Sequence, residues 1–155
     1  MSKIFETDSE IVDLVEKRFA ETDLSGIGVK LKVMSLTKAK EIIKVSGANA
    51  TTLFLTKNDD LICLYIYEQA FERLPRDFQV ALIEGALSNV SYDTEKDRLV
   101  VDTSRYGEML RMRKKLPNYI DILETGQLVI EQIADEEKER KEAEKEAKKA
   151  KRERT

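Results

Sequence analysis

The sequence contains no histidine and no tryptophan, and its single cysteine is Cys63. Without imidazole the chain cannot form a Ser-His-Asp or Cys-His catalytic pair, or a zinc site with histidine ligands. A lone cysteine cannot form an internal disulfide bond, which is typical of a protein kept in a reducing compartment. These absences exclude the commonest routes to nucleophilic and zinc-dependent catalysis.

Long apolar stretches are also lacking. No run approaches the ~18 residues that a membrane-spanning helix needs, and the first residues of the chain lack the apolar core of a signal peptide. Together with the single cysteine, this favours a soluble protein of the cytoplasm. Because the sequence contains neither a recognisable metal-ligand set nor a glycine-rich phosphate loop, we expect no metal and no cofactor.

The chain as a whole does not have a basic character. Its 27 Lys and Arg residues are set against 30 Asp and Glu residues, so the formal net charge is −3, which argues against a chain built throughout to bind nucleic acid. Charged residues nevertheless make up 37% of the chain, above the ~25% of a typical globular protein. This excess indicates a charge-dense segment beside one ordinary domain.

The charge-dense segment is the C-terminal part of the chain. Almost every residue of 135–154 is Glu, Lys, Arg or Ala, with acid–base pairs four residues apart that stabilise a lone helix. The segment has no heptad of Leu, Ile or Val for a self-sufficient coiled coil. We therefore expect a globular domain over residues 1–126 and a charged, partly solvated helix over 127–155. That helix is either a solvated appendage or an arm whose residues 148–154 contact an acidic surface.

The hydrophobic pattern predicts an α+β fold with a small mixed sheet and packed helices. Alternation of apolar and lysine residues predicts a strand over 29–34 with one buried face. Residues 61–67 are apolar at nearly every position, which predicts a central strand covered on both faces. The run 52–56 is expected to pair with it as an antiparallel hairpin around a short polar turn. A short last strand is predicted at 99–101.

Apolar residues at helical spacing predict the helices. The first is expected after a cap at Thr7, with Asp8 or Ser9 as competing caps, and the second after a cap at Thr37, ending near Gly47. Three more are predicted further along the chain: from Asp77 to about Val90, from a cap at Thr103 through Met112 to the basic run 111–115, and a short helix around Tyr119 that Gly126 ends. The charged C-terminal helix is expected to start at Leu128.

The middle of the chain has a distinctive order of elements. After the strand at 61–67 come Phe71-Glu72-Arg73-Leu74, a helix over 80–90, the short strand at 99–101 and then Asp102. This order resembles the phage metallopeptidases, a zincin-like family in which a hairpin strand and a Phe-x-x-Leu phrase precede a helix bearing HExxH, followed by a short strand and an aspartate or histidine. The resemblance covers about a third of the chain and implies a minimal zincin-like fold.

The residues that would carry the family's zinc chemistry are missing. The HExxH motif places two imidazoles one helical turn apart, with a carboxylate beside the first. In this sequence the ligand positions fall on Gly85 and Asn89, the base position falls on Ala86, and Asp102 matches a third ligand. Shifting the frame to keep Glu84 leaves apolar residues at the ligand positions. The resemblance therefore implies an inactivated scaffold, a pseudoenzyme of phage or prophage origin that acts in the host cytoplasm.

Other acidic residues suggest further alternatives. An acidic metal site could be drawn from one group, although its spacing is not that of a calcium-binding loop: Glu84, Asp93, Asp97 and Asp102. A carboxylate pair for hydrolysis could be drawn from a second group: Glu68, Glu72 and Glu84. A hydrolase that uses carboxylates alone is therefore the third alternative for the function.

A basic cluster provides the candidate partner-binding residues. Its five members lie on one predicted helix: Arg105, Arg111, Arg113, Lys114 and Lys115. Such a cluster is typical either of a solvated helix end, where bases suit the helix dipole, or of a site for an acidic partner. We expect a non-catalytic protein-binding module that acts on a host or phage protein as an inhibitor or regulator. The alternative is a nucleic-acid-associated accessory protein that uses the same cluster, with Tyr106 and Tyr119 stacking on bases.

Overall fold

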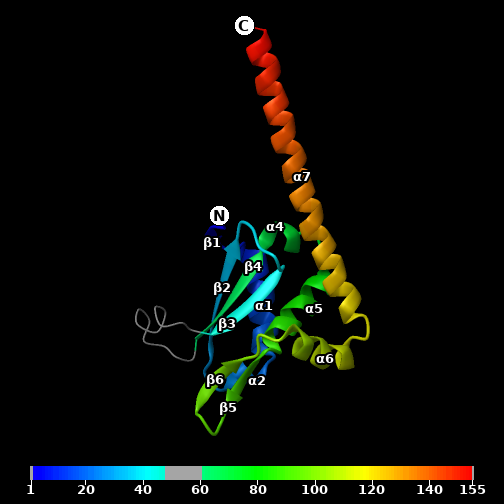
Figure 1. The fold of residues 1–155 in the computed structure, drawn as a ribbon. Helices are drawn as coiled ribbons and strands as arrows, with labels where there is room; N and C mark the ends of the chain where they lie inside the picture. The colour runs from blue at the N-terminus through cyan, green and yellow to red at the C-terminus, as the bar shows by residue number, and fades with distance from the viewer. Residues whose placement is uncertain (1, 48–60, 155) are drawn as a thin grey trace.

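The computed structural model describes residues 2–47 and 61–154 and confirms the α+β fold class (Figure 1). A small mixed sheet of four strands, a separate two-stranded sheet and the packed helices precede a long charged C-terminal helix. The elements are β1 (Ile4–Glu6), α1 (Ser9–Ala20), α2 (Asp23–Gly26), β2 (Lys30–Leu36), β3 (Ile43–Gly47), β4 (Leu61–Tyr67), α4 (Glu68–Phe71), α5 (Arg76–Leu87), β5 (Val90–Asp93), β6 (Arg98–Val101), α6 (Arg105–Lys115) and α7 (Tyr119–Glu153).

The four-stranded sheet has the order β1-β2-β4-β3, with β4 inside it as predicted. Strand β2 runs parallel to β4, while β1 and β3 are antiparallel to their neighbours. The alternate residues Ile62, Leu64 and Ile66 of β4 have no exposed surface, because α1 and α5 pack against each other and onto the sheet. A nearly continuous apolar strand therefore stands at the centre of the hydrophobic core.

The segment after β2 differs from its prediction. Thr37 does not cap a helix that ends near Gly47. Its side-chain oxygen accepts a hydrogen bond from the Lys3 backbone N–H, and the chain enters strand β3 at Ile43. Ile43 and Val45 lie opposite Ile66 and Leu64 of β4. Strand pairing of these β-branched residues outweighs their helical spacing. The predicted partner strand at 52–56 and its turn lie outside the described residues.

The N-terminal caps of α1 and α6 each lie one residue after the capping residue that the sequence favoured. The Asp8 carboxylate, rather than Thr7, accepts a hydrogen bond from the Glu10 N–H at 2.9 Å and starts α1. The Ser104 hydroxyl, rather than Thr103, accepts from the Gly107 N–H at 3.3 Å and starts α6. In both cases the residue that caps is a preferred capping type.

Helix α5 is shorter than predicted, because the chain turns into a strand where the helix was expected to end. The helix follows Pro75 and ends at Leu87, and Val90–Asp93 then forms β5. Strand β5 pairs antiparallel with β6, which confirms the predicted strand at 99–101 and adds a partner that was missed. The two strands form a hairpin at one end of the domain (Figure 1).

The predicted break at Gly126 is wrong, since α7 is one continuous helix of 35 residues. Gly126 is buried, and a Cβ there would lie 2.9 Å from Cδ1 of Ile42, so this glycine allows close packing rather than ending a helix. The helix contributes buried side chains as far as Ile133 and then leaves the domain (Figure 1). At the point of departure, the Arg73 guanidinium donates two hydrogen bonds to Glu136, at 3.1 and 2.7 Å.

No helix in the described parts of the chain combines the length and the apolar composition that crossing a membrane requires.

Candidate functional site

Two of the four predicted metal-site positions come together around an arginine. Asn89 follows the end of α5, Asp102 follows β6, and the backbone N–H of Asp102 donates to the Asn89 carbonyl at 2.7 Å. The Arg111 guanidinium, from α6, donates to Asp102 Oδ2 at 3.1 Å and also to Asn89 Oδ1. A protein cation therefore lies between the side chains at two of the positions that the resemblance assigns to the metal site.

The contacts extend from this centre to α7. The Asn89 side-chain amide donates to the Glu108 carboxylate at 2.8 Å, and the Tyr119 hydroxyl donates to the other Glu108 oxygen at 2.8 Å. Burial of Tyr119, together with the neighbouring Glu108 charge, raises the pKa of its hydroxyl well above the ordinary value. The polar network of Asn89, Asp102, Glu108, Arg111 and Tyr119 thus ties α5, α6 and α7 together.

The remaining two positions are occupied by packed backbone and apolar atoms. Gly85 and Ala86 are buried on α5. A Cβ on Gly85 would lie 2.8 Å from Cζ of Tyr119 and closer still to its hydroxyl oxygen. Within residues 2–47 and 61–154, no three carboxylate or thiol side chains gather closely enough to hold a metal ion.

The other acidic residues considered from the sequence have separate contacts. Glu84 forms an ion pair with Arg18 of α1, with 3.7 Å between the carboxylate oxygen and the guanidinium nitrogen. The Asp93 carboxylate accepts hydrogen bonds from two backbone N–H groups of the β5–β6 turn. Glu68 and Glu72 are close neighbours. Partial burial, followed by the charges of Glu68 and Asp8, raises the pKa of Glu72.

A cavity of about 660 Å³ lies beside the polar network, within the size range of ligand-binding pockets. Asn89, Asp102 and Glu108 of the network line it, and the lower part of α7 contributes further lining residues. Its apolar lining includes Ile42, Leu82, Ala86, Leu123 and Ile130, and its basic lining consists of Lys38, Lys40, Lys44 and Arg105.

The five predicted partner-binding residues divide into two groups. Arg111 belongs to the polar network, and Arg105 forms an ion pair with Glu41 at 2.7 Å. Arg113, Lys114 and Lys115 are exposed in the last turn of α6 and form no ion pair with any described residue. Only these three are available to an external acidic group without first breaking an internal pair.

The same helix also has an exposed apolar component, which was not predicted from the sequence. Tyr106 is 70% exposed and Leu110 is 45% exposed, and their spacing places them on one side of α6 with Arg113 and Lys114. We call these four residues the α6 outer face. Tyr119, the other tyrosine considered for stacking, is buried and cannot reach a partner.

Comparisons with protein-family models, with curated proteins and with solved structures find no match for this chain.

The polar network predicts an acid-sensitive stability. Hydrogen bonds from the Ser104 N–H and from Arg111 lower the pKa of Asp102 in the folded state. This contribution is complete above the unfolded-state pKa, near 4, and is lost as the pH falls through the folded-state pKa. The unfolding free energy of Asp102→Asn, followed by urea denaturation from pH 6 to pH 2, should therefore fall less steeply than that of the wild type. Parallel curves would contradict this role for Asp102.

Proposed function

We propose that the protein is a non-catalytic binding module that recognises an acidic protein partner through the α6 outer face. The observation that carries the proposal is the composition of this face. It combines an exposed aromatic side chain, an exposed leucine and cations without internal acidic partners. Tyrosine and arginine are enriched among the residues that dominate protein–protein affinity.

The inner side of α6 supports such a role. Met112 is buried, and Glu108 and Arg111 belong to the polar network. These contacts hold α6 to α5 and α7, so its outer side chains project from a fixed helix rather than from a loop. A rigid support reduces the ordering cost of binding.

The proposal includes the inactivated scaffold implied by the resemblance to phage metallopeptidases. Two observations support a non-catalytic role for that region. Gly85 and Ala86 supply no side chain that could bind a metal, and the Arg111 guanidinium occupies the space between Asn89 and Asp102. Phage or prophage origin, and an inhibitor or regulator acting on a host or phage protein, remain parts of the proposal.

The same residues give less support to nucleic-acid binding by the basic cluster. Arg105 and Arg111 have carboxylate partners inside the protein, and Tyr119 is buried. Three exposed cations and Tyr106 remain, whereas proteins that bind single strands present several aromatic side chains along a basic groove.

A capture experiment with paired variants tests the proposal. The full chain is immobilised, incubated with nuclease-treated bacterial lysate, and the retained proteins are identified and then titrated. The variant Tyr106→Ala/Arg113→Glu should weaken binding of the retained partner at least ~10-fold, because it removes an aromatic anchor and reverses a charge.

The control variant is Ile27→Ala/Lys17→Glu. It also shortens an exposed apolar side chain and reverses an exposed cation in the last turn of a helix, but away from α6. It should bind like the wild type. Equal weakening by the two variants, or capture of a partner only from lysate that has not been treated with nuclease, would contradict recognition by the α6 outer face.

A further inference from the structure

We infer that the C-terminal helix α7 carries a second binding surface, which holds the phosphate backbone of double-stranded DNA. The surface consists of lysines on one side of the helix: Lys138, Lys141, Lys145, Lys148 and Lys149. At 100° per residue these five positions fall within an arc of about 100° and span about 17 Å along the axis. We call them the α7 basic stripe.

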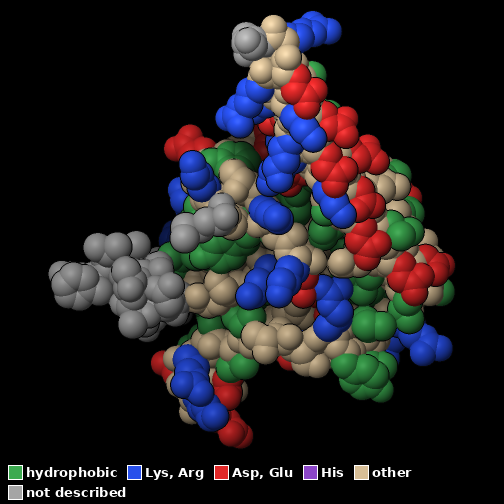
Figure 2. All heavy atoms as spheres, turned by 45° about the horizontal axis from the view of Figure 1, so that its top comes forward, with side chains coloured by type: hydrophobic (Ala, Val, Ile, Leu, Met, Phe, Trp, Pro, Cys, Tyr) green, Lys and Arg blue, Asp and Glu red, His purple; other side chains and the backbone are tan. Residues whose placement is uncertain are grey.

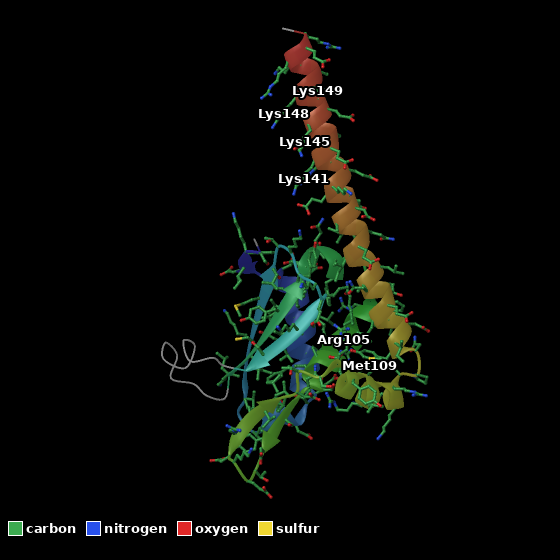
Figure 3. All side chains as sticks on the ribbon, in the orientation of Figure 1. Arg105, Met109, Lys141, Lys145, Lys148 and Lys149 are labelled. Carbon is green, nitrogen blue, oxygen red and sulfur yellow. The ribbon has the colours of Figure 1, made fainter. Side chains whose placement is uncertain are left out.

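Acidic residues of α7 flank the stripe on both sides, and Arg152 falls on the same arc as the stripe. Glu137 and Glu144 border it on one side, and five acidic residues occupy a narrow arc on the other: Asp135, Glu139, Glu142, Glu146 and Glu153. Figure 2 shows basic side chains along one side of the projecting helix and acidic side chains along another. Figure 3 shows Lys141, Lys145, Lys148 and Lys149 leaving the helix on the same side. A polyanion would be attracted to the stripe and repelled from the acidic residues that flank it.

The stripe continues the side of α7 that faces the cavity. Leu123, Gln127 and Ile130 line the cavity, and the helical period places them on the same arc as the stripe. The cavity's basic lining residues therefore surround the same cavity as this side of α7. Figure 2 shows that basic side chains also gather on the domain surface below the helix. Together they form one basic path along the arm and the domain.

Most cations on this path are not neutralised internally. Two of them form ion pairs: the Lys141 ammonium nitrogen lies 3.7 Å from a Glu137 carboxylate oxygen, and Arg105 pairs with Glu41. The other lysines of the path form no ion pair within the described parts of the chain: Lys38, Lys40, Lys44, Lys138, Lys145, Lys148 and Lys149. Binding to phosphates would therefore cost few internal ion pairs.

The composition of the stripe favours duplex DNA over other polyanions. A protein interface needs buried apolar or aromatic anchors, and a helix lying on a membrane needs an apolar side to insert. The only apolar residues between positions 135 and 153 are Ala143, Ala147 and Ala150, on a different arc. Single strands are held by aromatic stacking, and this segment has no aromatic residue. A straight, rigid row of cations suits the stiff, regularly charged backbone of a duplex.

Fluorescence anisotropy with a 24-base-pair duplex of mixed sequence and the full-length chain tests the inference. Contact with about five phosphates gives a slope of log K against log salt near −4.5, so the affinity should fall roughly 500-fold between 50 and 200 mM salt. Neutralising three lysines in Lys141→Gln/Lys145→Gln/Lys148→Gln should bring the slope to about −2 and lower the affinity at least ~10-fold at 50 mM salt. Glutamine keeps a good helix propensity, and circular dichroism checks the helix content.

The matched control removes three positive charges from the same helix but from another side. Arg140→Gln/Lys151→Gln/Arg154→Gln should bind the duplex nearly as tightly as the wild type. Three results would each overturn the inference: no duplex binding at 50 mM salt, equal weakening by both triple variants, or tighter binding of anionic vesicles or of the single strand than of the duplex. The variant Tyr106→Ala/Arg113→Glu should keep its DNA affinity, so this surface and the α6 outer face can fail independently.

Discussion

A chain shortened to end at Gly126 is expected to lose its cooperative unfolding transition, whereas a chain ending at Glu137 is expected to keep it. Residues beyond 126 include the buried side chains Val129 and Ile133. Each buried aliphatic side chain contributes about 1.5–3 kcal/mol, so their loss removes about 3–6 kcal/mol from a typical total of 5–15 kcal/mol. The eight residues of α7 that remain are also too few for a stable helix.

Thermal unfolding followed by circular dichroism and near-ultraviolet absorbance compares the two shortened chains. The chain ending at Glu137 retains both buried side chains and the contact between Arg73 and Glu136, so its Tm should lie within a few degrees of the wild type. If both chains unfold with the same Tm and the same cooperativity, the domain boundary at residue 126 predicted from composition holds, and the α7 packing is dispensable.

The substitution Gly85→Ala is expected to destabilise the protein, although alanine usually favours a helix. The new Cβ would overlap the ring of Tyr119, whose side chain is buried and cannot swing into solvent. Overpacking of this kind costs about 1–3 kcal/mol, and displacing the ring also breaks its hydrogen bond to Glu108, worth about 1 kcal/mol. A total of about 2–4 kcal/mol should lower the Tm by roughly 5–15 °C.

Two further variants show whether the tyrosine is the cause. Gly26→Ala places the same methyl group on another helix in open space, so it should leave the Tm unchanged or raise it slightly. Combining Gly85→Ala with Tyr119→Leu removes the overlapping ring, so the double variant should be more stable than the sum of the two single losses implies. Additive losses would mean that the Gly85 position is sensitive for another reason.

The parts of the fold that could be predicted are those with one dominant local signal. Strand β4 was predicted because it is apolar along its whole length, and β2 because its lysines alternate with apolar residues. The strand β3 was not predicted, because Ala39, Ile42 and Ile43 fit a helical spacing. Only the pairing with β4 decides between a helix and a strand here. Gly126 was read as a helix end because the close approach of Ile42 cannot be seen in the sequence.

The contacts of the candidate site could not be predicted from the sequence. Asn89 and Asp102 were predicted through the resemblance as positions of a lost metal site, and the structure brings them together around Arg111. Arg111 was assigned to an external partner, because its pairing with residues 9 and 22 positions earlier depends on how α6 folds back over α5. The exposure of Tyr106 and Leu110 likewise depends on which side of α6 the rest of the domain covers.

The direction in which α7 leaves the domain is set by the packing of its N-terminal half, whose buried side chains extend to Ile133. The two hydrogen bonds between Arg73 and Glu136 hold the helix about one turn further along. From Glu137 to Glu153 the helix extends about 24 Å beyond this contact, so a change of only 10° in its direction would move its end about 4 Å. Both side chains of the pair are partly exposed to solvent, and their attraction weakens as salt is added. A small adjustment at the base of the exposed segment is therefore amplified along its length.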